Sequence, residues 1–159
     1  VFGLAEELGI KRQRAKEIIA SYNEQFNTLE AFTKSCIKLA REKEYAETIM
    51  GRRRKLPGVN SNNGMVKAFA ERNAVNAPIQ GSAADIIKVA MVKLFNELEK
   101  GDWKAKIIMQ VHDELVLDVP KDELESLKPI VRECMESAVE IIVPLIVDMK
   151  SGEDWLAAH

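Results

Sequence analysis

Two runs of apolar residues near the end of the chain constrain its fold most strongly. Residues 104–111 and 115–119 are two short runs rich in apolar residues, and each is typical of a strand. Only His112, Asp113 and Glu114 stand between the two runs, and a connection this short suits a hairpin of antiparallel strands. The sequence therefore predicts an antiparallel sheet with a polar turn at one end.

Most of the remaining sequence is helical in pattern. Apolar residues recur at helical spacing over residues 11–26, 28–43, 65–75, 79–100 and 122–141. Further strands are expected over residues 45–50, 53–56 and 143–149. We expect Pro78 to separate two helices and Pro129 to kink or break the last one, because proline lacks a backbone N–H. This order of elements predicts an α+β fold rather than a repeating βαβ pattern.

The composition is that of a soluble domain or part of one. Apolar residues make up 47% of the 159 residues and charged residues 30%. No stretch approaches the roughly 20 apolar residues that a membrane-spanning helix needs. Cys36 and Cys134 fall on the apolar faces of predicted helices and do not have the spacing of a zinc site, so we expect them to be reduced core thiols. We therefore expect a cytoplasmic protein without a membrane partner.

The formal net charge of −2 conceals an uneven distribution of charge. Residues 51–72 carry six basic side chains and one acidic one, whereas residues 110–154 carry four basic and twelve acidic ones. A basic stretch of this kind suits a polyanion, and an acidic region suits metal ions. The two regions together indicate a protein that could hold both.

The turn of the predicted hairpin is a candidate metal site. Asp113 and Glu114 are adjacent carboxylates, and hard divalent cations such as Mg²⁺ prefer carboxylate oxygens. A turn of this size holds only part of a coordination shell, and Asp118 lies at the other end of the hairpin. At least one more carboxylate must therefore come from elsewhere. The alternative is a purely structural turn, because Asp is common in turns.

Two further segments could contact nucleic acid. Arg72 and Asn76 are four residues apart, so they share a helix face, and Gln80 follows just past Pro78. Such side chains can donate to minor-groove acceptors, although they could equally form a solvated polar face. Residues 52–55 form a basic turn that suits phosphate contact, or that only keeps the loop soluble.

These segments resemble one family. Residues 72–81, with Ala-Ala-Asp at 83–85, resemble a helix segment of the family A DNA polymerases, the bacterial DNA polymerase I type. Residues 110–116, Gln-Val-His-Asp-Glu-Leu-Val, resemble the third palm motif of that family, motif C. Residues 50–53 resemble its strand turn after the fingers helices, and residues 151–155 its C-terminal end. The resemblance runs through the whole chain in order.

The resemblance implies a template-directed polymerase that transfers a nucleotide from a dNTP to the 3′-hydroxyl of a primer. In that family two Mg²⁺ ions assist an in-line attack on the α-phosphorus. Carried over to this chain, Asp113 is a metal ligand and Glu114 its acidic partner, also counted as a ligand, while His112 helps to place the primer terminus. All three are expected to be catalytic.

The resemblance also implies partners and domains. Primer–template DNA and dNTP would be the partners, with Arg72, Asn76 and Gln80 near primer and template, and Arg52 and Arg53 also in contact with DNA. Residues 1–43 would be a helical fingers segment. Residues 44–159 would be a palm segment with the motif C hairpin and a C-terminal strand. The protein would act at the bacterial nucleoid.

Two motifs of the family are missing from this sequence. Motif A, a strand that ends in Asp followed by Tyr-Ser and a Glu, is absent, and so is motif B, the fingers helix that grips the incoming nucleotide. We therefore expect the chain to be the C-terminal part of a polymerase domain, inactive alone and possessing no complete metal site. It could self-associate through an exposed sheet edge.

Other functions stay open at this point. The main alternative is a non-catalytic module that binds duplex DNA through its basic segment. A weaker one is a metal-dependent hydrolase built on Asp113 and Glu114, which would need a second cluster of ligands that the sequence does not offer.

Overall fold

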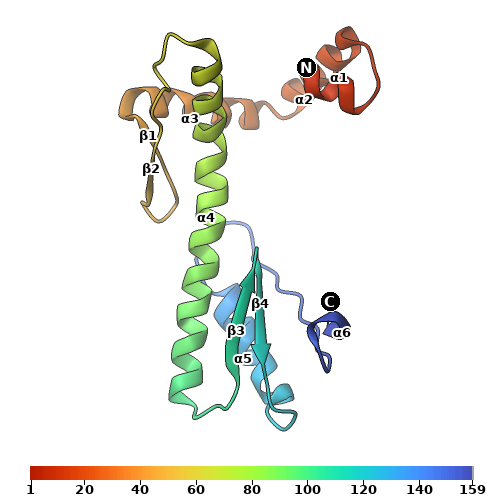
Figure 1. Ribbon diagram of the computed structural model, residues 1–159, viewed down its shortest axis with the longest axis vertical. Coiled ribbons are helices and arrows are strands. Elements are labelled where there is room, and N and C mark those ends of the chain that lie inside the picture. The colour runs from red at the N-terminus through yellow and green to blue at the C-terminus, as the bar shows by residue number, and fades with distance from the viewer. Residues whose placement is uncertain (159) are drawn as a thin grey trace. The chain divides into compact units, whose positions relative to one another are not determined.

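The computed structural model describes residues 1–158 and shows six helices and four strands within them (Figure 1). In chain order the elements are α1 (Phe2–Glu7), α2 (Arg12–Gln25), α3 (Asn27–Lys43), β1 (Tyr45–Glu47), β2 (Arg53–Lys55), α4 (Gly64–Lys100), β3 (Lys106–Val111), β4 (Glu114–Asp118), α5 (Leu124–Glu136) and α6 (Trp155–Ala158). The strands form two separate antiparallel pairs, β1 with β2 and β3 with β4. The predicted α+β class is confirmed. None of the described helices is long and apolar enough to cross a membrane.

The chain divides into two compact units. One unit comprises Val1–Glu47 and Gly51–Pro78, and the other comprises Thr48–Met50 and the chain from Ile79 onward. Within the first unit, α3, the β1–β2 hairpin and the start of α4 share one core. The assignment of a fingers segment and a palm segment stays a prediction.

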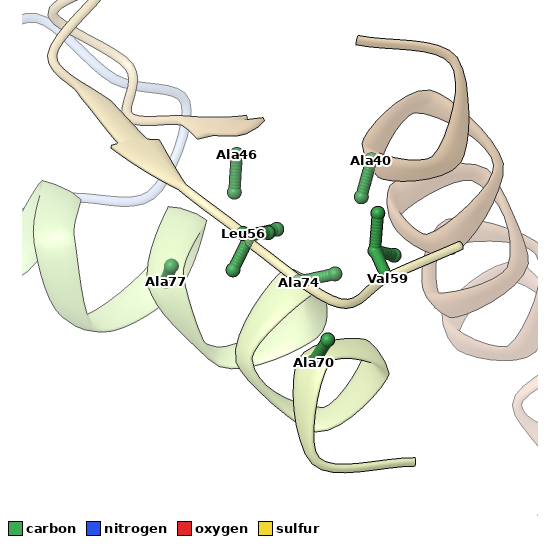
Figure 2. Packing of buried hydrophobic residues seen from close by; sticks show 7 residues of the cluster. All are labelled: Ala40, Ala46, Leu56, Val59, Ala70, Ala74 and Ala77. Carbon is green, nitrogen blue, oxygen red and sulfur yellow. The ribbon is translucent and has the colours of Figure 1, made fainter. Parts of the chain in front are cut away.

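The core of the first unit is built largely from small side chains. Leu56 and Val59, which follow β2, are almost fully buried between α3 and α4 (Figure 2). The side chains that α3 and α4 pack against these two residues are alanines. Because alanine is small, the backbone of the connecting segment lies close to both helices. The cluster consists of Ala40, Ala46, Leu56, Val59, Ala70, Ala74 and Ala77. Packing of this kind stabilises a fold through many close contacts rather than through large side chains.

Helix α4 is continuous from Gly64 to Lys100, with Pro78 inside it. The predicted break at Pro78 is therefore wrong. A proline inside a helix costs about 3 kcal/mol, because it removes a hydrogen bond and crowds the preceding turn. Packing before and after the proline offsets this cost, since Ala74 and Ala77 are buried on one side of it and Ile87 and Leu94 on the other.

The second half of α4, the β3–β4 hairpin and α5 form the core of the second unit. Leu94 of α4 and Leu127 of α5 are its most deeply buried large side chains. Leu98, Ala105, Val131 and Cys134 complete the cluster, and Ile107, Leu115 and Leu117 of the hairpin pack against it. Both cysteines of the chain are free thiols, and burial raises the pKa of the Cys134 thiol. The hairpin is thus fixed on one face by a helical layer.

Two predictions for the C-terminal region are wrong. Helix α5 ends at Glu136 rather than near residue 141, and residues 143–149 form no strand. The backbone N–H of Val147 donates to Glu136 Oε1 at 3.0 Å, and its carbonyl accepts from Arg132 Nη1 at 3.0 Å. Side chains of α5 therefore satisfy the groups that a neighbouring strand would otherwise pair. Pro129 lies inside α5 and does not end the helix.

Candidate functional site

The β3–β4 hairpin closes through a two-residue turn. Val111 pairs directly with Glu114, so only His112 and Asp113 lie between the strands. The backbone of His112 is left-handed, with φ of 55°, a conformation that tight hairpin turns require. Gln110 Nε2 donates to the His112 carbonyl oxygen at 2.8 Å, which ties the turn to the end of β3. The predicted three-residue connection is therefore shorter by one residue, because Glu114 already belongs to β4.

A bulge in β3 sets which side chains share a face of the hairpin. Ile107 pairs with Leu117, but the next pair is Met109 with Val116, so Ile108 is an extra residue on β3. A bulge of this kind reverses the alternation of side chains along the strand. Leu115 and Leu117 pack into the core, and Glu114 therefore lies on the opposite face, away from α5.

The three predicted catalytic residues lie together at this turn. His112, Asp113 and Glu114 are consecutive and all are exposed. The carboxylates of Asp113 and Glu114 suit a hard divalent cation in chemistry, and both side chains are exposed. Within residues 1–158, however, no group of three or more His, Cys, Asp or Glu side chains is placed to hold a metal ion. The turn therefore presents two carboxylates, which among these residues do not form a complete metal site.

The predicted minor-groove residues are on α4. Arg72 and Asn76 are exposed and lie on the same face of the helix, away from the buried Ala74 and Ala77. The Arg72 guanidinium lies 5.9 Å from the centre of the Phe69 ring, which helps to hold its aliphatic stem along the helix. Gln80 is exposed as well and belongs to the second compact unit.

The predicted basic turn follows β1. Arg52 and Arg53 are exposed, and Arg53 begins β2. Arg53 Nε donates to Glu47 Oε2 at 2.8 Å, and its guanidinium lies 4.7 Å from the centre of the Tyr45 ring. The hydrogen bond to Glu47 raises the pKa of Arg53 above its ordinary value. Arg53 is therefore a fixed cation, already paired with a carboxylate on the neighbouring strand.

Sequence reasoning missed a polar cluster in which the half-buried Thr48 contacts α4 beside the buried Ser82 and Asp85. Ser82 and Asp85 are buried on α4, and both accept hydrogen bonds from the segment that follows β1. The available signal was a lone acidic residue, Asp85, within an otherwise apolar helical stripe. Such a residue needs a buried partner, because an unpaired buried carboxylate is costly.

Comparison with known proteins assigns the chain to a family. A family model described as DNA polymerase family A matches residues 1–157. The chain therefore belongs to DNA polymerase family A, and the resemblance seen in the sequence is confirmed. Members of this family generally use divalent metal ions.

Individual relatives agree with this assignment. The chain is 47% identical to DNA polymerase I of Lactococcus lactis subsp. lactis (strain IL1403) and 45% identical to DNA polymerase I of Bacillus subtilis (strain 168), each over 157 residues. These matches cover 99% of this chain and 18% of each relative, so the chain spans about a fifth of the length of these curated relatives. Among solved structures, the POL domain of Pol1 from M. smegmatis, in complex with DNA primer-template and dNTP, matches with a TM-score of 0.96 and 41% identity. That match covers 99% of this chain and 28% of the other.

The left-handed turn residue yields a stability prediction. A β-branched side chain at position 112 is strained at positive φ, whereas glycine adopts this conformation freely. We expect His112→Val to destabilise the hairpin by about 1 to 2 kcal/mol relative to His112→Gly, as measured by urea unfolding of the 159-residue chain. Equal stability of the two variants would contradict the turn geometry.

Proposed function

We propose that this chain supplies the catalytic hairpin of a template-directed DNA polymerase, which transfers a nucleotide from a dNTP to a primer 3′-hydroxyl. The observation that carries the proposal is the exposed His112-Asp113-Glu114 turn in a chain of DNA polymerase family A. Support comes from the matching M. smegmatis POL domain, whose structure holds DNA primer-template and dNTP. Primer–template DNA and dNTP are accordingly the proposed partners, and the bacterial cytoplasm at the nucleoid is the proposed location.

Asp113 and Glu114 have separate parts in this proposal. Asp113 projects from the turn as a metal ligand, and Glu114, on the strand face away from the core, adds a second carboxylate beside it. Two bound Mg²⁺ ions would supply Lewis-acid activation of the primer hydroxyl and neutralise charge on the triphosphate. His112 places the primer terminus, and its own position is fixed by the bond from Gln110 to its carbonyl.

In this proposal DNA is contacted by five exposed polar residues, which are Arg52, Arg53, Arg72, Asn76 and Gln80. Arg72, Asn76 and Gln80 present donors suited to minor-groove acceptors or to the sugar–phosphate backbone. Arg52 and Arg53 contact phosphate, with Arg53 held in place by Glu47. These contacts position the primer and the template without carrying sequence information.

We further propose that the 159 residues alone do not catalyse synthesis, because residues 1–158 hold no third ligand near the turn. The chain alone is also proposed to self-associate, since among the described residues β3 and β4 pair only with each other and Ile108 is 60% exposed. Size-exclusion chromatography at high protein concentration tests this last point, and a clean monomer would count against it.

The catalytic proposal is tested with a chimera in which residues 1–157 replace the matching segment of DNA polymerase I from L. lactis. We expect the chimera to extend a primer and the Asp113→Ala variant to lose at least about a thousandfold in rate, because a metal site contributes several kcal/mol to the transition state. Primer extension under single-turnover conditions is the measurement.

The matched control for this experiment is Asp118→Ala. Asp118 is an exposed carboxylate at the opposite end of the same hairpin, where it lies opposite Lys106 in the strand register. We expect this variant to keep the activity of the chimera, and both variants to keep DNA binding. An active Asp113→Ala chimera would contradict the proposed role, as would template-dependent synthesis by the 159 residues alone.

A second candidate function is a non-catalytic duplex-binding module, which is favoured by the exposed basic residues at positions 52–55. In that case the 159-residue chain binds duplex DNA with an affinity that falls as salt rises. Arg72→Ala then weakens binding by about tenfold and Asp113→Ala does not, as measured by fluorescence anisotropy. Binding that is absent, or insensitive to salt, would exclude this function for the chain alone.

A further inference from the structure

Among the residues that the structure describes, two polar residues, Ser82 and Asp85, are buried. They are 8% and 7% exposed. They lie three residues apart on α4, so both project from the same face of the helix. The chemistry proposed above assigns neither of them a role. A buried hydroxyl and a buried carboxylate in a largely apolar stripe need specific partners to be tolerated.

The two residues that follow β1 each supply one such partner. Thr48 Oγ1 donates to Asp85 Oδ2 at 2.6 Å, and the backbone N–H of Ile49 donates to Ser82 Oγ at 3.0 Å. The first bond is short and involves a carboxylate, which makes it stronger than a neutral hydrogen bond. We call Thr48, Ser82 and Asp85 the polar clamp. It joins parts of the chain that are more than thirty residues apart.

The segment that the polar clamp holds leads directly into the basic turn. After Met50 the chain passes through Gly51, whose φ of 77° favours glycine, and reaches Arg52. The segment before the turn is thus held by one side-chain and one backbone hydrogen bond, and the bend that follows has a defined conformation. An arginine contacts phosphate with little entropic loss only when the backbone that carries it is held in place.

We propose that Thr48, Ser82 and Asp85 are positioning residues, which hold the start of the basic turn so that Arg52 meets a DNA phosphate. The proposal rests on the proposed function and deepens it. The three residues touch neither substrate nor metal in this role and act through Arg52. Asp85 is then a structural carboxylate distinct from the pair at the β3–β4 turn.

A purely structural role predicts a different result, and salt dependence separates the two. The slope of log affinity against log salt concentration reports how many phosphates the protein neutralises, at about 0.9 per phosphate. A variant that only unfolds part of the protein lowers the fraction that binds and leaves this slope unchanged. A variant that misplaces Arg52 reduces the slope itself.

The experiment compares Thr48→Val with Thr48→Ser in the chimera. Valine keeps the shape of threonine but removes the hydroxyl, whereas serine keeps the hydroxyl. We expect Thr48→Val to weaken primer–template binding by about tenfold and to reduce the salt slope by about 0.9. Thr48→Ser should restore both quantities to those of the unmodified chimera. In an Arg52→Ala background, Thr48→Val should reduce the slope no further.

Amide hydrogen exchange at Ile49, measured on the same proteins, shows whether the clamp has opened. We expect about tenfold faster exchange of this amide in Thr48→Val. The variant loses the Thr48–Asp85 hydrogen bond, and without it the neighbouring bond from the Ile49 N–H to Ser82 opens more often. Unchanged exchange would overturn the clamp itself. Faster exchange with an unchanged salt slope, or equal loss of slope with and without Arg52, would overturn the positioning role and leave the proposed function standing. If the unmodified chimera showed no salt-dependent binding, the proposed function would fail and this inference with it.

Discussion

Helix α4 is the element on which both cores of this chain depend. Its first half places Ala74 and Ala77 against the segment that follows β2, and its second half places Leu94 and Leu98 against the β3–β4 hairpin and α5. Pro78 lies between these two regions and removes one backbone hydrogen bond. The helix remains continuous because each side is stabilised by its own packing. The hairpin with Asp113 and the exposed side chains of Arg72 and Asn76 all rely on this one element or on a core that it builds.

Local pattern predicted much of this fold, and its failures have physical causes. The hairpin was predictable because two apolar runs flank a short polar turn, and α2 and α3 were predictable from helical spacing. The break expected at Pro78 did not occur, because tertiary packing outweighs the local preference of a proline. The strand expected over residues 143–149 did not form, because Arg132 and Glu136 satisfy the backbone of Val147. In both cases the deciding contacts are distant in sequence.

The candidate site, like the fold, could be predicted from the sequence only in part. His112, Asp113 and Glu114 could be identified because they are consecutive, and consecutive residues on a tight turn stay together in any fold that contains the hairpin. The role of Thr48 with Asp85 could not, because 37 residues separate them and neither belongs to a short motif. The bulge at Ile108, which shifts the alternation of side chains along β3, was also invisible in the sequence. Resemblance to the family supplied the chemistry of the turn, and the structure supplied its geometry.

We propose above all that Asp113 holds a divalent cation in a site completed by residues outside this chain. Binding of Mn²⁺, followed by electron paramagnetic resonance of the chimera with primer–template and a non-hydrolysable dNTP, tests it most directly, since the free ion and the bound ion give different spectra. Our account predicts Mn²⁺ binding in the chimera and in Asp118→Ala, and weaker binding by at least about tenfold in Asp113→Ala, because a carboxylate ligand is lost. Unchanged Mn²⁺ affinity in Asp113→Ala would contradict the claim.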